Sequence, residues 1–583
     1  MDLDGTPDVG TLLEAVESAD ADVREEALDR LASAAWRDDD FAVATARAVP
    51  ELARLARELP AARADLLRLL ADLAERDDWP EEGQLPLVAV ELPPLLSFAQ
   101  DPDPAVRDSV TALVLSCRHL DALPLLRSRV AEEPEPGVRG HAVTALALLE
   151  PGDWRHALLT DPEPPVRLAA AEDLLRTAEP PFPHDLVDVC AQAYTADPYD
   201  LDEGHWAPAP HRRFSDRLLD DPEAALRAAA QGVPLAYEIT ARWRDREADV
   251  LPYALRDLED GELHQLARLC QNLPEDLWAP VRERVRPFLD GGFTERAAAV
   301  TVLARVRAPE AVGEAVRLVT DEPGAAPGPY SVVLAVRAVT EVFGAGALPV
   351  ARAVAGRIGR THADLIRVLE RYPEVALGVV DEITALVPRY EGGHAWAAVE
   401  LLGALGPAAG EGAARALREE ATGGDHSSVA VYAAMAHHRV TGDPALALRL
   451  LAADGPTRWS ALAAGLGPAA APLLPHFEPL LSPDVHPVTR ARAAHAVLRI
   501  TGRIEDTVEP LAHCAADAGA HHTDRLAAVT ALTGTGPLPR SAVAPLRATA
   551  ESPRRVVEEP GGGPEQHPDY VLREAVRTLL TAT

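Results

Sequence analysis

Three side chains near residue 513 have the types and the spacing of metal ligands. His513, Asp517 and His521 stand at i, i+4 and i+8, which on one unbroken helix would place them on a single face. Gly519 interrupts the run and favours a polar turn, since glycine commonly ends a helix. A second acidic group lacks the glycine and the distal glutamate of a calcium-binding EF-hand loop. It comprises Asp197, Asp200, Asp202 and Glu203. We therefore expect no metal and no other cofactor.

The N-terminus carries a short motif of phosphoryl transfer. Asp2-Leu-Asp-Gly-Thr6 matches the nucleophile motif of the haloacid-dehalogenase phosphatases, in which the first Asp ends a buried parallel strand. Only Met1 precedes Asp2, no strand–helix–strand pattern follows, and Pro7 interrupts the continuation. We interpret the match as coincidental and expect no hydrolytic, phosphoryl-transfer or dehydrogenase activity.

All basic side chains other than His are Arg, because the sequence has 56 Arg and no Lys. A phosphate-loop Lys, a Schiff-base Lys and a Ser-x-x-Lys pair are therefore impossible. The motifs G-x-S-x-G and H-E-x-x-H do not occur either. The near absence of Asn, of which Asn272 is the only example, accompanies this bias and is typical of a GC-rich bacterial genome.

The formal net charge of −35 is unevenly distributed along the chain. Residues 1–200 carry 41 acids and 17 Arg, a net charge of −24, whereas residues 201–583 carry 50 acids and 39 Arg, a net charge of −11. Negative charge repels phosphate backbones, so direct binding of nucleic acid is disfavoured. It favours instead a partner protein with a basic surface, although solubility of a long exposed chain is an alternative reason for the charge.

Three features indicate a cytoplasmic protein that does not associate with a membrane. The four cysteines are scattered, as small core residues in a reducing compartment would be. The N-terminus has neither the basic region nor the apolar run of a signal peptide. The apolar stretch 461–475 contains three prolines and cannot form a membrane span.

Two proline signatures recur and predict helix starts. The first is acid-Pro-acid-x-x-Val/Leu-Arg, which begins at residues 101, 133, 161 and 221, spacings of one or two repeats. Its acids suit the start of a helix, and proline tolerates the first turn. Apolar residues then follow at helical spacing, as in Val106, Val110 and Leu113. A weaker copy predicts Val23, Ala27, Leu31 and Ala34 as core positions.

The second signature is a proline followed by an apolar helix. Copies contain Pro50, Pro124, Pro349, Pro472, Pro510 and Pro545. Gly442 and Gly502 each follow a threonine and are predicted to end a helix between these copies. The sequence therefore predicts an all-α, right-handed solenoid of helix pairs.

These signatures together resemble HEAT repeats, in particular the short bacterial type also found in phycobilin lyases. The resemblance implies that the acid and the Arg of each signature form a structural ladder between neighbouring repeats. The residues concerned are Asp103 with Arg107, Glu135 with Arg139, and Glu163 with Arg167. It also implies two enzymatic alternatives, a lyase acting on a cofactor-bearing protein and a HEAT-like DNA glycosylase, the latter opposed by the charge.

Four aperiodic stretches are predicted as loops, at 76–86, 195–215, 321–330 and 558–569, and a capping helix is expected over 570–581. We expect acidic repeats over 1–180, irregular repeats over 181–290 and degenerate repeats over 291–583. The favoured function is that of a non-catalytic scaffold, regulator or immunity-type partner that binds a basic protein. The predicted contact residues, in the loop 195–215, are Tyr199, Asp200, Asp202, Glu203 and Trp206.

Overall fold

A computed structural model describes residues 9–37, 48–75, 87–196, 214–321, 330–388, 393–423, 428–455, 457–557 and 567–582. These residues form helices and no β-strand, and their only β-type pairing is an isolated antiparallel bridge between Trp243 and Arg554. The predicted all-α solenoid is confirmed. The chain divides into two compact units, Met1–Leu235 and Ala236–Thr583.

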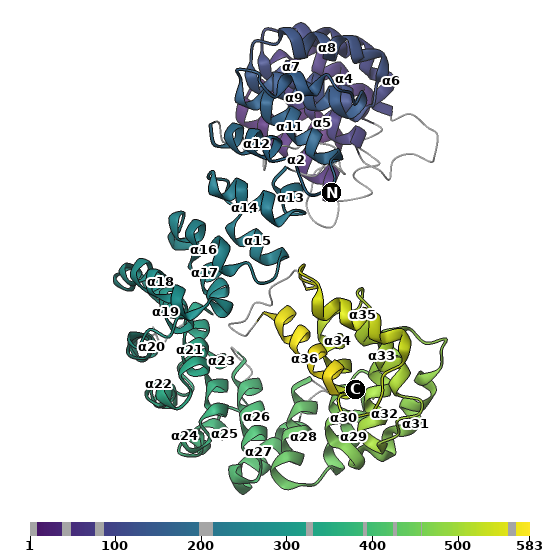
Figure 1. The fold of residues 1–583 in the computed structure, drawn as a ribbon. Coiled ribbons are helices and arrows are strands. Elements are labelled where there is room, and N and C mark those ends of the chain that lie inside the picture. Colours follow the sequence, from purple (N-terminus) through teal and green to yellow (C-terminus); the bar gives the residue numbers. More distant parts are fainter. Residues whose placement is uncertain are drawn as a thin grey trace. The chain divides into compact units, whose positions relative to one another are not determined.

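In the first unit, one series of helices packs side by side and forms an inner layer (Figure 1). The inner series is α5 (Arg63–Glu75), α7 (Pro104–Ser116), α9 (Pro136–Leu149) and α11 (Pro164–Thr177). The helices that alternate with them are α4 (Val49–Glu58), α6 (Leu87–Leu95), α8 (Leu123–Glu132), α10 (Arg155–Leu158) and α12 (His184–Ala196). The unit is completed by α1 (Val9–Val16), α2 (Ala21–Arg37), α13 (Phe214–Leu218) and α14 (Pro222–Ala230).

Among the positions whose side chains the structure describes, the predicted core residues of this unit are buried with one exception, and Ala34 lies outside them. Val106 and Val138 are 2% and 7% exposed. Ala27 and Leu31 are also buried, but Val23 is 43% exposed, so its predicted core position is wrong. The reason is that α2 packs chiefly on α1, and Val23 in the first turn of α2 lies outside that contact.

The second unit repeats the alternation over more helices. Its inner series is α17 (Leu263–Leu269), α19 (Phe293–Arg305), α21 (Tyr330–Phe343), α23 (Ala363–Ile366), α26 (His394–Leu405), α28 (Ser428–Thr441), α30 (Ser460–Leu466), α32 (Pro487–Thr501), α34 (His522–Leu532) and α36 (Pro568–Ala582). The alternating helices are α15 (Ala236–Arg242), α16 (Glu247–Arg256), α18 (Trp278–Val285), α20 (Glu310–Asp321), α22 (Leu348–Ala355), α24 (Pro373–Leu377), α25 (Val380–Thr384), α27 (Gly410–Thr422), α29 (Ala445–Ala453), α31 (Leu474–Phe477), α33 (Val508–Ala516) and α35 (Arg540–Glu551).

Most copies of the second proline signature do open helices. Pro50, Pro124 and Pro349 lie in the first turns of α4, α8 and α22, where the missing N–H has no intrahelical partner to lose. Two copies differ from the prediction. Pro472 lies inside the 3₁₀ helix Gly467–Leu473, and Pro545 lies inside α35, which already begins at Arg540.

The glycine caps and the final helix agree with the sequence. Gly442 and Gly502 directly follow α28 and α32 and have φ values of 80° and 71°, a left-handed conformation that ends a helix. Helix α36 spans Pro568–Ala582, close to the predicted 570–581. Most of the predicted loop residues, 76–86, 197–213, 322–329 and 558–566, lie outside the described part of the chain.

One described segment, Tyr330–Ala355, is long and apolar enough to cross a membrane by length and composition alone. It is divided between α21 and α22 by the 3₁₀ turn Gly344–Ala347. Half of its most apolar window is buried among neighbouring helices, and α21 packs along α19. In this fold the segment is therefore part of the core of the second unit.

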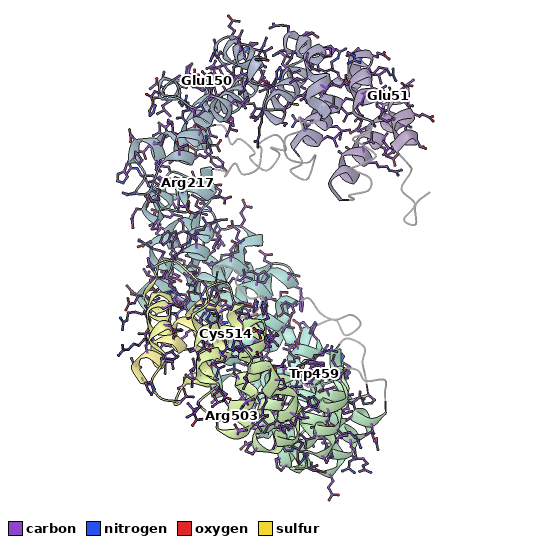
Figure 2. The ribbon with its side chains drawn as sticks, turned by 90° about the vertical axis from the view of Figure 1, so that its right-hand side faces the viewer. Glu51, Glu150, Arg217, Trp459, Arg503 and Cys514 are labelled. Carbon is purple, nitrogen blue, oxygen red and sulfur yellow. The ribbon has the colours of Figure 1, made fainter. Side chains whose placement is uncertain are left out.

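All four cysteines are buried free thiols, and Figure 2 labels Cys514, which lies in α33. Burial raises the pKa of the Cys117 thiol to about 12 and that of Cys514 to about 11, and it also raises the pKa of Cys190 and Cys270. Because the thiolate is the reactive form, these cysteines are poor nucleophiles at neutral pH.

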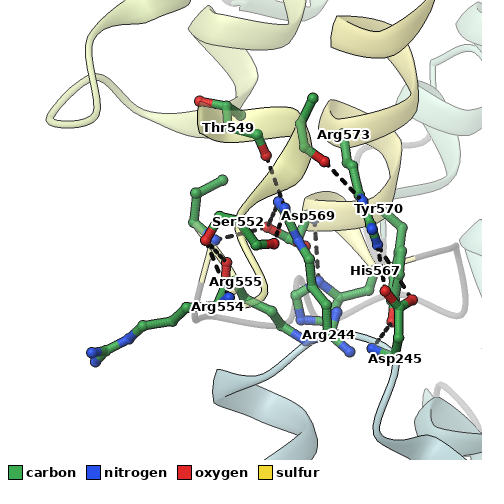
Figure 3. Close-up of polar contacts among 12 residues, drawn as sticks. Arg244, Asp245, Thr549, Ser552, Arg554, Arg555, His567, Asp569, Tyr570 and Arg573 are labelled. Carbon is green, nitrogen blue, oxygen red and sulfur yellow. Dashed lines mark hydrogen bonds and ion pairs between the residues drawn. The ribbon is translucent and has the colours of Figure 1, made fainter. Parts of the chain in front are cut away.

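The loop after the first helix of the second unit meets the last helix (Figure 3), and this contact closes the unit into a ring (Figure 1). Arg244, in the loop between α15 and α16, donates hydrogen bonds of 2.7 and 2.9 Å to the two carboxylate oxygens of Asp569 in the first turn of α36. Both side chains are fully buried. Arg244 also donates to the carbonyl oxygens of Thr549 and Ser552, both at 2.8 Å, and the backbone N–H of Val556 donates to Asp569. Both charged groups therefore have several partners.

Backbone hydrogen bonds reinforce this closure. The N–H of Arg244 donates to the carbonyl of Pro553, and the N–H of Arg555 donates to the carbonyl of Arg242, each at 2.8 Å. The buried Arg555 guanidinium lies 3.1 Å from Glu247, which also accepts a 2.8 Å bond from the Tyr570 hydroxyl. The expected capping helix thus closes the unit on itself.

Replacing Asp569 with Asn should destabilise the second unit by about 3–5 kcal/mol, because it leaves the buried Arg244 charge without its carboxylate. Hydrogen–deuterium exchange should then accelerate both at residues 242–245 and at residues 553–556, which are far apart in sequence. The control is Asp506→Asn in the exposed Arg503–Asp506 pair, which should cost under about 1 kcal/mol. Faster exchange on one side only would contradict closure by this pair.

Candidate functional site

The predicted partner-binding residues Tyr199, Asp200, Asp202, Glu203 and Trp206 lie outside the described residues. They follow α12 in the first unit. In the rest of that unit, the signature residues position the helices.

The signature arginines bond to the following repeat through the first acid of its signature. The guanidinium of Arg107 donates to both carboxylate oxygens of Glu133, at 2.5 and 3.0 Å, and also to the carbonyls of Asp101 and Pro102 in its own repeat. Arg139 likewise pairs with Asp161, and Arg63, which begins α5 and belongs to no signature copy, pairs with Asp101 at 3.0 Å. These bonds fix the spacing of neighbouring repeats and so the geometry of the inner layer.

The second acids of the signatures, which the family resemblance implicated, have a different position. Asp103 is the N-cap of α7 and accepts from the N–H of Ala105 at 2.9 Å. Glu135 and Glu163 precede α9 and α11 without a side-chain capping bond. The backbone N–H groups of Asp103, Glu135 and Glu163 instead donate to the first acid. Arg167 bonds the carbonyls of Asp161 and Pro162.

Among the first acids, Glu133 is the most enclosed, with a fully buried side chain. Burial opposes its ionisation, but the bonds from Arg107 and Arg129 outweigh that effect and lower the pKa of its carboxyl. A lowered folded-state pKa means that this contribution to stability is present above the unfolded pKa and is lost on acidification.

Glu133→Ala should therefore destabilise the first unit by about 3–5 kcal/mol at neutral pH, because two buried arginines lose their partner. Glu135→Ala, two residues away on an exposed side chain without a capping bond, should change stability by less than about 0.5 kcal/mol. Urea denaturation followed by circular dichroism compares the two. If Glu135→Ala destabilised the unit more than Glu133→Ala, the ladder would depend on the second acid, which would contradict this account.

A row of charged side chains crosses the inner layer of the first unit. Asp108 on α7 accepts from Arg68 on α5 at 3.1 Å and contacts His141 on α9 at 2.6 Å. Sequence reasoning missed this row, although Asp108 directly follows the signature Arg107 and His141 lies two residues after Arg139. The two residues are 33 positions apart, about one repeat, and this spacing is the signal that could have indicated their contact.

Two further acids lie one above the other on α5, beside this row. Asp65 and Asp72 are separated by seven residues and therefore share a helical face. Desolvation raises the pKa of Asp72 to about 6, with Arg68 acting in the opposite direction. Desolvation and the neighbouring Asp29 raise the pKa of Asp65. Desolvation disfavours the ionised form of both carboxyl groups. A positively charged side chain of a partner would stabilise that ionised form.

Because its folded-state pKa is raised, Asp72 favours the folded state below about pH 4, and this contribution is lost as the pH rises towards 6. Asp72→Asn should consequently stabilise the first unit at pH 7–8 by up to about 3 kcal/mol, at about 1.4 kcal/mol for each pKa unit. Denaturation at pH 4, 6 and 8 tests this. A variant that is less stable than the native chain at pH 8 would contradict it.

The candidate metal residues do not share a helical face. Helix α33 ends at Ala516, before Asp517, and His521 is the N-cap of α34, accepting from the N–H of Thr523. The helix thus ends earlier than Gly519, where the sequence placed the break. Within the described ranges, no group of three or more His, Cys, Asp or Glu side chains is placed to hold a metal ion.

Two of the tryptophans that seem dispersed in the sequence come together in the second unit. Trp396 on α26 packs on Tyr432 of α28 with ring centroids 4.4 Å apart, and Tyr432 meets Trp459 edge-on at 5.9 Å. Figure 2 labels Trp459, whose indole N–H donates to Asp454 at 2.8 Å. The stacking of repeats thus brings aromatic residues that are distant in sequence side by side.

No family model and no curated protein matches the chain. Solved structures that it resembles include Kap121p bound to Pho4p, at 13% identity and a TM-score of 0.45, covering 98% of this chain and 78% of that one. Kap121p bound to Nup53p is 13% identical with a TM-score of 0.42, and the match covers 98% of this chain and 77% of that one. A structure of Kap95p with RanGDP is 14% identical with a TM-score of 0.37, and the match covers 98% of this chain and 88% of that one. The HEAT resemblance remains a prediction from the signatures, and the fold class of an α-solenoid rests on the helices of this chain.

Proposed function

We propose that the chain is a non-catalytic, protein-binding solenoid whose first unit binds a basic protein or peptide. The observation that carries the proposal is the excess of acids in that unit, since residues 1–235 contain 47 acids and 21 Arg, a net charge of −26. The remaining 348 residues contain 44 acids and 35 Arg, a net charge of −9. A field of this sign accelerates the approach of a positively charged partner.

The inner layer supplies the contacts that such a partner would need. Arg68 and His141 already bond Asp108, whereas Asp65 and Asp72 lie on the neighbouring face of α5 with raised pKa values. An arginine or lysine from a partner would pair with these two carboxylates. Tyr199 and Trp206, in the segment after α12, are proposed as its apolar anchors, because aromatic side chains contribute most of the binding energy at many interfaces.

The proposed pairing predicts a specific dependence on pH. Since Asp72 is protonated below about pH 6, a cationic partner must displace its proton there. Affinity should therefore fall as the pH decreases through 6, and the Asn variant should lose this dependence. Cytoplasmic location and a regulator or immunity-type role fit the proposal and await identification of the partner.

The experiment uses the full chain and a ten-residue Arg-rich peptide, with binding measured by calorimetry at several salt concentrations. Asp65→Asn with Asp72→Asn should weaken binding at least tenfold and flatten its salt dependence. The matched control, Asp381→Asn with Glu382→Gln on exposed positions of α25, removes the same charge from the second unit. Equal weakening by both pairs, or equal binding of a poly-Glu peptide, would overturn the proposal.

A further inference from the structure

A cavity of about 430 Å³ lies on the inner series of the second unit. Arginines from three inner elements line it: Arg337 of α21, Arg367 and Arg371 of the 3₁₀ turn Arg367–Arg371 after α23, and Arg439 of α28. Three glutamates, Glu341, Glu370 and Glu400, line it as well, and Glu341 pairs with Arg305. Such a density of arginines is unexpected in a chain whose net charge is −35.

These arginines differ in whether they already form ion pairs within the fold. Arg367 pairs with Glu400 at 2.7 Å and lies 3.7 Å from Asp364. The side chains of Arg371 and Arg439 are exposed and form no hydrogen bond or ion pair with a described residue, and the charge of Arg371 acts to lower the pKa of the neighbouring Glu370 carboxyl. Two guanidinium groups of this kind supply two positive charges and up to five N–H donors each. That combination suits a dianion better than a single carboxylate.

The aromatic cluster lies on the same face of the helices that carry the cavity. Trp396, Glu400 and Ala404 follow one another on α26 at intervals of four residues, and Arg439 lies seven residues after Tyr432 on α28. At about 1.5 Å per residue, the apolar cluster is about 12 Å from the far end of the cavity. An extended peptide covers this distance in about four residues.

We propose that the inner face of the second unit binds a phosphorylated segment of a partner protein, with its phosphate on Arg371 and Arg439. An apolar side chain about four residues away contacts Trp396, Tyr432 and Trp459. A phosphate monoester carries a charge of about −1.5 to −2 at neutral pH and accepts the paired N–H donors of arginine. The inference extends the proposed protein-binding function to a second surface with the opposite charge preference.

The test measures binding by the full chain in low salt of three probes: inorganic phosphate, a ten-residue peptide with phosphoserine four residues from a leucine, and the unphosphorylated peptide. The phosphopeptide should bind best. Arg371→Gln with Arg439→Gln should weaken binding of phosphate and of phosphopeptide at least tenfold. Trp459→Ala should weaken the phosphopeptide only, whereas Glu370→Gln should strengthen both, because it removes a negative charge from the cavity.

The matched control is Arg415→Gln with Arg449→Gln, two exposed arginines on α27 and α29, which should leave every affinity unchanged. Equal binding of both peptides, native affinity in the Arg371 and Arg439 variant, or no preference for phosphopeptide over phosphate would each overturn the proposal. None of these variants lies in the first unit, so binding of the Arg-rich peptide should persist in all of them. Failure here is therefore distinguishable from failure of the proposed function.

Discussion

The ion pair between Arg244 and Asp569 is the constraint on which the second unit depends. Removing two charges from water costs several kcal/mol for each ion, and attraction offsets that cost only where the remaining donors and acceptors are bonded. Here Arg244 reaches two carbonyls besides the carboxylate, and Asp569 accepts from the N–H of Val556. The pair therefore forms only when the loop after α15, the segment after α35 and the start of α36 meet in one arrangement.

Closure changes the energetics expected of a solenoid. In an open stack each end repeat has one neighbour, and unfolding can begin there. In the second unit the end helices contact each other, and α36 in addition buries Leu572, Val576 and Leu579 against the preceding repeat. Each repeat that contributes to the inner face, with its cavity and aromatic cluster, therefore packs against a neighbour on both sides.

Arginine provides both the ladder of the first unit and the closure of the second. Arg107 and Arg244 each bond one carboxylate through two nitrogens while reaching two backbone carbonyls. The ammonium group of lysine has three donors on a single atom and cannot reproduce this planar fork. The absence of lysine is thus compatible with both of these junctions.

Much of the fold could be predicted because it follows from interactions between residues close in sequence. Contacts between residues far apart in sequence could not be predicted. Helix starts at the signatures, the glycine caps at Gly442 and Gly502 and the final helix follow from short-range rules, and the structure has them. The pairing of Arg107 with Glu133 rather than with a second acid depends on side-chain reach between repeats. Closure joins residues with a separation of 325 and no sequence period, so no pattern could indicate it. The predicted contact loop, 195–215, lies largely beyond the described residues.

The most direct test of the closure is a disulfide between Trp243→Cys and Arg554→Cys. These residues face each other in an antiparallel bridge, flanked by the bonds from Arg244 to Pro553 and from Arg555 to Arg242. Such non-hydrogen-bonded pairs have Cα atoms about 4.5 Å apart, within disulfide reach. The four native thiols are buried and should not compete. Closure predicts an intramolecular disulfide under mild oxidation, detected as a monomer with changed mobility, and two free thiols or only intermolecular dimers would contradict it.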